Sequence, residues 1–421
     1  MINYWQRGVP VWEARYLTRP FVALCMVAGV GIVLAVLRVV SPLGPFSGMS
    51  DLYAWGVWKT FNVMTLTAFG SAGLSVGVAT WVLGHTRLHA VMRTAILVSL
   101  LFYGTGLVAL GVDVGRVWNF YNIIFPWRWN TDSAMLEVAV CMPLYACVFL
   151  AFENVPYVLE RYYVTGGPVA RRWIGAAEPH LRRIYPFMIA GAYVLPAMHQ
   201  SSLGALLSLA GWKVHPLWQT PWLPVLYVVQ ALVCGFAAII FTLMTACLYW
   251  ERPIDVSILA ELGDLLSKTS LFWLGLRFAD VAWRRELGAA FSFDSYSMLF
   301  LAENVGLLIP ALVLRSRRMR ETPRVLYNMA TLAGLASLLY RFSPTTLAYR
   351  PGGSQDVYFP SLPELLIMLG WIAVAIVGFS LAVKTFAILP APIAAWDRLV
   401  SAARAYHPEW RLDAHGNAAD D

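Results

Sequence analysis

Long apolar segments separated by short polar connections run through this chain from about residue 20 to residue 390. A run of roughly 20 apolar residues is long enough to cross about 30 Å of hydrocarbon as an α-helix. Such runs can be placed at ten positions, namely 20–40, 54–83, 91–112, 133–156, 184–206, 223–249, 264–283, 295–314, 325–347 and 364–389. The pattern therefore predicts an all-α membrane protein with about ten transmembrane helices.

The composition supports this interpretation. Hydrophobic residues make up 59% of the 421 residues and charged residues only 13%, whereas a soluble protein carries about 25% charged residues. The 18 tryptophans and 19 tyrosines are typical of the aromatic belts at the two membrane interfaces. We expect a multi-pass protein surrounded by the lipid bilayer, with no nucleic-acid partner.

Basic residues divide unequally between the two sides of the membrane. Nineteen arginines fall in the N-terminal segment, in every second connection and in the C-terminal tail, against six arginines and one lysine on the other side. By the positive-inside rule both termini are cytoplasmic. We therefore expect a cytoplasmic segment at 1–19, a transmembrane domain at 20–390 and a cytoplasmic tail at 391–421.

A weak internal similarity relates spans 3 and 4 to spans 7 and 8. The third span ends ALGVDVGRVW and the seventh LRFADVAWRR, and the fourth opens TDSAMLEV where the eighth opens FDSYSMLF. An offset of four helices keeps the same orientation in the membrane. This similarity predicts two four-helix bundles, formed by spans 2–5 and 6–9, with the first and last spans flanking them.

The connections on the outer side, which carry few charges, are long and aromatic. They read DVGRVWNFYNIIFPWRWNTD (113–132), GWKVHPLWQTPW (211–222) and AYRPGGSQDVYFPSLP (348–363). Loops with so much Trp, Tyr, Pro and Gly favour a surface on which a partner docks. A simple belt of interfacial aromatic residues is the alternative.

Charged side chains inside a span cost at least ~2.5–3.5 kcal/mol each, so each one calls for a reason. Here they gather at one depth, within about two turns of the outer face, and they are Lys59, Asp113, Glu137, His199, Arg277, Asp280 and Arg341. Glu303 lies deeper. This grouping predicts a polar cluster beneath the aromatic outer loops.

Several of these residues also have a structural explanation. Glu137 follows TDS at a helix start, where the helix dipole favours a carboxylate. Asp280 is three residues after Arg277, a spacing that suits an ion pair on one helix face, and Asp264 with Lys268 has the spacing of another. Glu364 completes a capping box with Ser361, and we assign it no other role.

His199 and Gln200, in AMHQSSLG, lie in the middle of an apolar segment, and no other histidine falls within a predicted span. A haem held between two histidines needs two such ligands, so we expect no b-type haem. The five cysteines are scattered without a CxxC motif, so we expect no iron–sulfur cluster and no metal site. A histidine can nevertheless donate, accept and transfer a proton near neutral pH, although a lone buried histidine is often only a packing residue.

Four stretches carry a family resemblance: MHQSSLGALLSLAGWKVHPLW (198–218), DVGRVWNFYNIIFP (113–126), LEVAVCM (136–142) and PGGSQDVYFPSLPELL (351–366). In order and spacing they resemble the HybB-type membrane subunits of respiratory nickel–iron hydrogenases, within the NrfD-like family. The resemblance implies a protein of the bacterial inner membrane that has no redox centre of its own and binds quinone near the outer face. It also implies a ferredoxin-like iron–sulfur subunit docked on the periplasmic face, together with the nickel–iron large and small hydrogenase subunits.

The resemblance also suggests which residues act. Glu137, His199 and Asp113 match family positions suited to proton transfer, and the positions that would contact the quinone are Arg116, Trp118, Gln200, Arg277 and Asp280. The chain departs from the family pattern at Asp280, where a glutamate is expected, and at Lys59, where an apolar residue is expected. Both departures affect the expected route of protons.

Taken together, these features favour the quinone-reactive subunit of a hydrogen:quinone oxidoreductase, with menaquinone or ubiquinone as substrate and with coupling to proton movement left open. One alternative keeps the quinone chemistry and replaces the partner by a molybdenum enzyme or a multihaem cytochrome. Another is an ion transporter, which ten spans with a parallel repeat would also suit. Against transport, the sequence shows no paired half-helices broken by Gly or Pro at matching depths.

Overall fold

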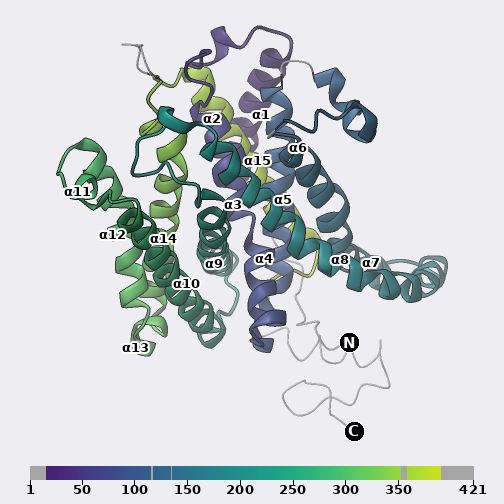
Figure 1. Ribbon diagram of the computed structural model, residues 1–421. Helices are drawn as coiled ribbons and strands as arrows, with labels where there is room; N and C mark the ends of the chain where they lie inside the picture. Colours follow the sequence, from purple (N-terminus) through teal and green to yellow (C-terminus); the bar gives the residue numbers. More distant parts are fainter. Residues whose placement is uncertain (1–15, 115–116, 134, 352–357, 390–421) are drawn as a thin grey trace.

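The computed structural model describes residues 16–114, 117–133, 135–351 and 358–389, and in these ranges the protein is helical apart from its loops and one isolated β-bridge between Val214 and Tyr349. The long helices lie side by side, and shorter helices cap the two ends of the bundle (Figure 1). The all-α prediction is therefore confirmed.

A helical segment occupies each of the ten predicted positions. In chain order these are α1 (Arg19–Val39), the segment from α2 (Val57–Lys59) to η4 (Val78–Val82), α5 (His89–Asp113), the segment from α6 (Met135–Pro143) to α7 (Ala151–Thr165), α8 (Pro168–Ser208), α9 (Leu223–Tyr249), α10 (Val256–Trp283), α12 (Ser295–Val313), α14 (Pro323–Phe342) and α15 (Leu362–Thr385). The short helices α11 (Leu287–Ala290) and α13 (Arg317–Arg320) lie in the connections.

Within the described part of the chain, seven of these segments are long and apolar enough to cross a membrane. The other three positions hold α8, α10 and α14, which are long enough but more polar. These three helices carry His199 and Gln200, Arg277 and Asp280, and Arg341. The protein is therefore a multi-pass membrane protein, and its most polar long helices are the ones that bring charged and polar groups into the interior.

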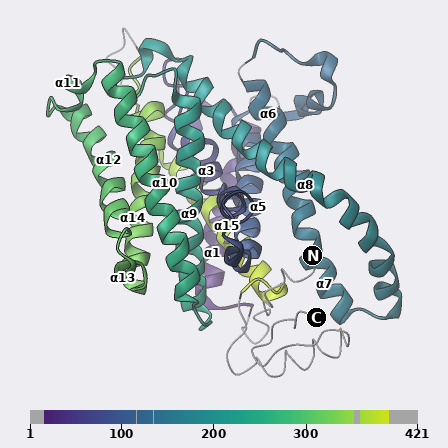
Figure 2. The same ribbon diagram turned by 60° about the horizontal axis from the view of Figure 1, so that its bottom comes forward.

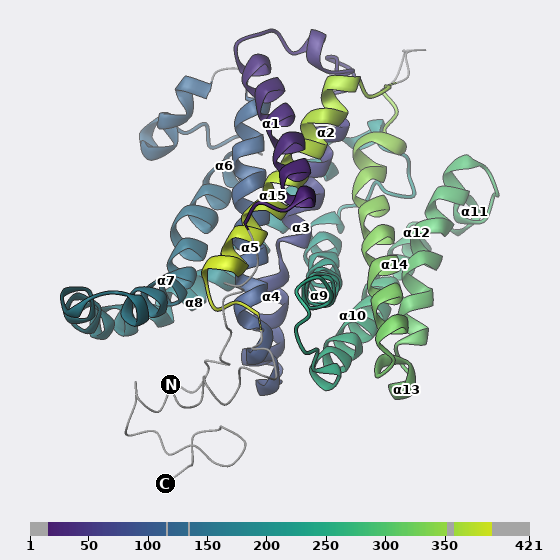
Figure 3. The ribbon, with the colours of Figure 1, turned by 180° about the vertical axis from the view of Figure 1, so that it is seen from behind.

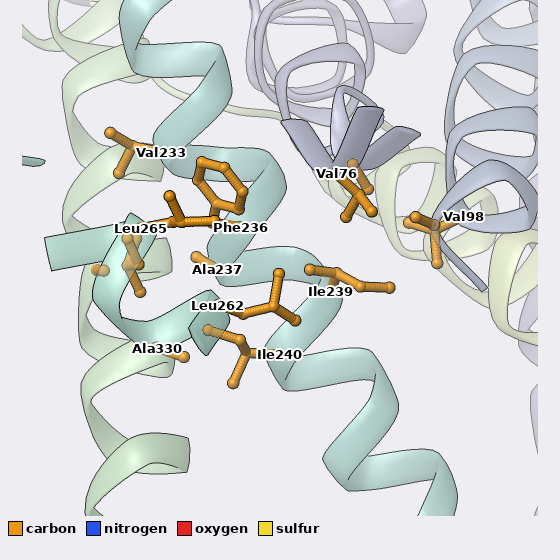
Figure 4. Close-up of a cluster of buried hydrophobic side chains, with 14 of the residues drawn as sticks. Val76, Val98, Val233, Phe236, Ala237, Ile239, Ile240, Leu262, Leu265 and Ala330 are labelled. Atoms are coloured by element: carbon orange, nitrogen blue, oxygen red, sulfur yellow. The ribbon is translucent and has the colours of Figure 1, made fainter. Parts of the chain in front are cut away.

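The long helices pack as two groups that meet at α9. One group holds α9, α10, α12 and α14, and the other is formed by the segments at predicted spans 2–5 (Figure 2). Helix α9 also contacts α4 (Ala72–Gly77) and α8 of the other group. Buried side chains of α9, among them Val233 and Phe236, belong to a core that also contains Val76 and Leu265 (Figure 4).

Helices α1 and α15 flank the two groups and lie against each other (Figure 3). Their contact depends on a pair of glycines. A Cβ atom added to Gly31 would come within 2.5 Å of the Cα atom of Gly370. Because the two backbones approach this closely, a side chain at either position would push the helices apart.

Four π-helical turns interrupt the described helices, namely η3 (Thr60–Leu66), η4, η8 (Leu144–Leu150) and η10 (Ser343–Leu347). Of these, η3 leads directly into Thr67 and η8 follows Pro143. Proline lacks a backbone N–H and disrupts the regular α-helical hydrogen bonds, and π-helical turns are frequent at functional sites. Both turns border the buried polar cluster of the first group.

Candidate functional site

The centre of the first helix group holds a buried polar cluster formed by His199, Gln200, Tyr103 and Thr67. The Gln200 Nε2 amide donates to Thr67 Oγ1 at 3.2 Å and to the Tyr103 hydroxyl at 3.3 Å. These side chains come from α8, α5 and α3 (Thr67–Phe69), and none of the four residues has any exposed surface. Three helices thus hold one hydrogen-bonded amide in an otherwise apolar interior.

His199 lies beside this amide with both ring nitrogens free. Neither Nδ1 nor Nε2 has a hydrogen-bond partner, and the Gln200 Oε1 atom is also unpaired. The ring packs edge-on against Tyr103, with 5.5 Å between ring centroids, and Tyr103 in turn packs against Tyr145 at 4.7 Å. Buried polar atoms normally have a partner, so this cluster offers unused donors and acceptors.

His199 lies in the second half of α8, nine residues before the helix ends at Ser208. At 1.5 Å per residue this is about 14 Å from the end of the helix.

Asp113 occupies a second polar position, at the last residue of α5. Both of its carboxylate oxygens are buried, and the indole nitrogen of Trp58 lies close enough to act on the carboxylate as a hydrogen-bond donor. Lys59 and Arg38 lie close enough for their charges to act on the carboxylate. Lys59, which departs from the family pattern, therefore acts as a nearby cation for Asp113.

Glu137 lies apart from the buried cluster. It sits in the first turn of α6 with its side chain exposed, and among the described residues its carboxylate has no hydrogen bond or ion pair. Helix α6 packs against α8, which carries His199 and Gln200. Glu137 therefore lies on a helix beside the cluster, but its own side chain is exposed at the start of that helix.

The two loop residues of the predicted site cannot be placed together. Trp118 lies in the 3-10 segment η6 (Val117–Ile124) and is 67% exposed. Arg116 lies outside the described residues. The exposed aromatic side chains nearby are Tyr121 and Trp127, whereas Trp129 is half-buried and donates from Nε1 to the carbonyl of Ile123 at 3.0 Å.

The predicted pairing of Arg277 with Asp280 is wrong. Asp280 accepts from Arg284 at 2.8 and 3.1 Å and from Thr220 at 2.6 Å. In a helix an acid four residues before a base is the favoured orientation, and Arg284 offers it to Asp280. The ion-pair partner of Arg277 therefore comes from another helix.

That partner is Glu303 on α12, and the sequence analysis gave it no role. Arg277 Nη2 lies 3.7 Å from Glu303 Oε2, and neither side chain is exposed. Glu303 also accepts from the indole nitrogen of Trp218, at 3.1 Å to each oxygen, and from the hydroxyl of Ser343. Its signal in the sequence was a carboxylate deep within an apolar span, where an ionised group requires a partner.

Arg341 connects the two helix groups electrostatically. Its Nε donates to Gln230 Oε1 at 2.7 Å and its Nη2 to the carbonyl of Tyr227 at 2.9 Å. It is also close enough for its charge to act on His199 and Tyr103. The second group therefore contributes a fixed positive charge to the neighbourhood of the first cluster.

Glu364 has a larger role than helix capping. Ser361 does cap α15 by accepting from the backbone N–H of Glu364, as predicted. The Glu364 carboxylate, however, is buried and accepts from the Tyr358 hydroxyl at 2.6 Å and from the backbone N–H of Gly48 at 3.2 Å. It therefore ties the start of α15 to the loop after α1. The predicted pair of Asp264 and Lys268 is confirmed, at 2.6 Å.

His199 is the one described histidine within a predicted span, and it has no exposed surface. In the described part of the chain no three His, Cys, Asp or Glu side chains gather as metal ligands would.

Comparisons with known proteins agree on one family. The family model for "Polysulphide reductase, NrfD" matches residues 45–344. The chain is 34% identical over 374 residues to the "Probable Ni/Fe-hydrogenase 2 b-type cytochrome subunit" of Escherichia coli K12, covering 88% of this chain and 91% of that protein. It is 24% identical over 371 residues to the "Menaquinone reductase, integral membrane subunit" of Nitratidesulfovibrio vulgaris Hildenborough, covering 82% of this chain and 85% of that protein.

Proposed function

Because the chain belongs to the NrfD family of polysulphide reductase membrane proteins, we propose that it is the quinone-binding membrane subunit of a periplasm-facing hydrogenase, in the bacterial inner membrane. It passes electrons between an iron–sulfur partner subunit and the quinone pool. The names of the two relatives support the two halves of this proposal, one a hydrogenase subunit and the other a menaquinone reductase subunit. The second name favours menaquinone over ubiquinone.

One observation carries the proposal for the quinone site, namely the set of unpaired polar atoms around His199. Quinone carbonyls accept hydrogen bonds, and the His199 ring and the Tyr103 hydroxyl offer donors in a buried apolar region. Ligand sites are commonly apolar with a few such oriented polar groups. Gln200 holds the Tyr103 hydroxyl in place, so it positions the donor.

Reduction of a quinone to a quinol consumes two electrons and two protons. The electrons come from the partner subunit, and the protons must reach the quinone oxygens from the aqueous side. His199 can hold and release a proton at its ring nitrogen. Asp113 and Glu137, on α5 and α6, carry carboxylates nearer the outer loops, and we assign them to proton delivery.

The exposed aromatic residues of the 113–132 loop support the partner assignment. Trp118, Tyr121, Ile124 and Trp127 are all more than half exposed, and such a grouping outside the membrane spans is typical of a protein interface. We assign this surface to the ferredoxin-like iron–sulfur subunit, which the large and small hydrogenase subunits supply with electrons. If this loop faces the periplasm, both termini lie on the opposite, cytoplasmic side, and residues 20–390 form the membrane domain.

We also propose that this chain carries no haem, although the name of one relative includes a b-type cytochrome. The reason is that the described residues supply a single intramembrane histidine, whereas a haem between helices generally takes two. The isolated chain should be colourless. A b-type absorbance band retained after every other subunit is removed would contradict this.

The quinone assignment can be tested on the assembled complex by replacing His199 with phenylalanine, which keeps the ring and removes both nitrogens. We expect hydrogen-dependent quinone reduction to fall at least tenfold while reduction of an artificial dye at the partner subunit persists. The control is His180→Phe, an exposed position on the same helix. Unchanged quinone reduction in the His199 variant, or equal loss in both variants, would rule out a role for His199.

A second candidate activity is proton movement through the second helix group, and the buried Glu303 favours it. A carboxylate with no exposed surface, beside a cation at 3.7 Å and two hydrogen-bond donors, can exchange a proton without large movements of the helices. In proteoliposomes with a pH-sensitive dye inside, Glu303→Gln complexes selected for full quinone reduction, and therefore for intact folding, should show no hydrogen-driven acidification. Acidification at the wild-type rate would exclude Glu303 from proton movement.

A further inference from the structure

A helical hairpin projects sideways from the bundle at one end of the long helices. It consists of α7 and the first half of α8, joined by Gly166 and Gly167, and it extends beyond the rest of the protein (Figure 1; Figure 3). The first residue of α8 that is buried is Ala192. Residues 168–191 therefore form nearly seven turns of helix in which every residue is exposed or half-buried.

The uncovered half of α8 has an apolar stripe. At 100° per residue, Val169, Trp173, Ile184 and Phe187 fall within about 60° of one another. Their exposed fractions are 68%, 73%, 42% and 76%. The exposed His180 lies in the same sector, and Ile184 and Phe187 belong to the start of the predicted span. A stripe this exposed would be costly in water, because its apolar area has no protein to pack against.

Two arginines lie along one edge of this stripe, Arg172 and Arg183, about 40–60° beyond it at the same helical spacing. Both are exposed, and neither has a hydrogen bond or ion pair in the described part of the chain. The other two arginines of the segment are engaged, since Arg182 pairs with Glu178 at 2.7 Å and Arg171 donates to the carbonyl of Tyr163 at 3.1 Å. The two unpaired cations are thus the ones beside the apolar stripe.

From this arrangement we propose that the first half of α8 is a binding surface for anionic phospholipid at the membrane interface. A helix with an apolar face and arginines beside it inserts the apolar face at the boundary between headgroups and acyl chains. The arginines then meet phosphate groups, for which guanidinium geometry is well suited. The stripe leads into the predicted span that begins at residue 184, which continues the same face into hydrocarbon.

The positive charge of this segment favours anionic lipid over a second copy of the chain as the group that covers the stripe. The segment 168–187 has four arginines and one glutamate, so a second copy of the same surface would repel it. The hairpin also belongs to the side that the basic residues predict to be cytoplasmic, where the leaflet is rich in anionic lipid. The proposal requires no step of quinone chemistry, so it can fail or succeed independently of the proposed function.

The test measures lipid binding to the purified full chain in mild detergent by native mass spectrometry, with phosphatidylglycerol and phosphatidylcholine as probes. Each basic residue near an anionic surface strengthens association about fivefold. We therefore expect R172Q/R183Q to weaken phosphatidylglycerol binding about 25-fold, with phosphatidylcholine binding unchanged. The conservative variant R172K/R183K should bind nearly as well as the wild type, and inorganic phosphate should not displace the lipid.

The matched control is R315Q/R318Q, which removes two exposed arginines from a different inner connection. Lipid binding to α8 should stay within about twofold of the wild type. The reason is that salt screens an exposed charge, so these arginines act only on their own surroundings. All these positions are exposed, so folding should survive. Equal weakening in both double variants, or no preference of the wild type for phosphatidylglycerol, would overturn the proposal. So would a dimer that W173S/F187S dissociates, because a second copy would then cover the stripe.

Discussion

Arg277 on α10 and Glu303 on α12 form an ion pair in which neither side chain has any exposed surface, with 3.7 Å between Nη2 and Oε2. The guanidinium also lies against the rings of Trp273, Phe300 and Tyr340. A buried charge is tolerated only while its partners remain in place. The stability of the second helix group should therefore depend on both residues together.

Replacing one member of this pair should destabilise the protein more than replacing both. We expect Arg277→Met or Glu303→Gln alone to cost about 3–5 kcal/mol, because the remaining group loses its partner in an apolar interior. The double variant should melt above either single variant, because it leaves no unpaired charge in the interior. Thermal unfolding of the purified chain in detergent measures the order of the melting temperatures.

The control for this prediction is Arg317→Gln, which breaks the pair with Glu321, where the two side chains are 84% and 45% exposed. An exposed pair contributes about 0–1 kcal/mol. If the two single variants of the buried pair melt no lower than this control, the pair does not stabilise the second helix group.

The loop at 113–132 provides the test of partner docking. Trp118 and Trp127 are 67% and 78% exposed, and exposed tryptophans at an interface commonly contribute most of the binding energy. Replacing both by serine should release the iron–sulfur partner, with each residue contributing about 1–2 kcal/mol. Trp129 is unsuitable for this test because its indole holds the loop together through Ile123.

Co-purification of the partner at ordinary salt measures the effect. Trp81→Ser is the control, since Trp81 is also exposed but lies at the other end of its span. The docking assignment is wrong if the partner stays bound to the double variant.

Glu137 can act as a proton relay or only as a helix-start carboxylate, and the two roles predict different results. If it relays protons, Glu137→Gln should abolish hydrogen-dependent quinone reduction while reduction of an artificial dye at the partner persists. If it only stabilises the start of α6, the change costs about 0.3–1 kcal/mol and quinone reduction stays normal. Asp132→Asn, an exposed carboxylate in the same loop, should be without effect under either role.

His215 makes the contact between two outer loops sensitive to acid. Its ring stacks on Tyr296 at 4.6 Å, and its backbone N–H donates to the carbonyl of Ala348 at 2.9 Å. Burial and the nearby Arg350 lower the pKa of His215 below its ordinary 6.5, and Asp294 only partly opposes them. The closed loops therefore hold the neutral ring, and the opened loops take up a proton more readily.

The loop contact should accordingly be fully stable above about pH 6.5 and weaken as the pH falls below it. Hydrogen exchange of the His215 amide, expressed as a protection factor at each pH, measures this opening. In His215→Phe, which keeps the stacking and cannot titrate, protection should not depend on pH in this range. Protection in the wild type that is equal at pH 7.5 and pH 5 would contradict the prediction.

The ten helical segments could be predicted from the sequence because apolar length alone specifies a span. The internal partners of polar residues could not. Glu303 meets Trp218, which lies 85 positions away in the chain, and local spacing offered Arg277 a nearer partner in Asp280. Spacing within one helix limits which residues can meet, but the other helices decide which of them do.

The grouping of the polar side chains could be predicted only in part for the same reason. His199 and Gln200 are adjacent in the sequence, so they stay together in any helix, and the structure brings Tyr103 and Thr67 to them. Nothing in the sequence indicated Tyr103, because a tyrosine in an apolar helix is common near a membrane interface. Glu137 and Trp118 are exposed and lie outside the buried cluster, because sequence position alone does not determine which way a side chain faces.

The central claim is that quinone binds beside His199, and photo-crosslinking tests it most directly. The assembled complex is illuminated with an azido-quinone, digested, and analysed for labelled peptides by mass spectrometry. Labels are expected on the α8 peptide with His199 and Gln200 or on the α5 peptide with Tyr103, and they should be lost when excess unlabelled menaquinone is present. Labels confined to α10, α12 or the partner subunit, or labels that menaquinone does not displace, would contradict it.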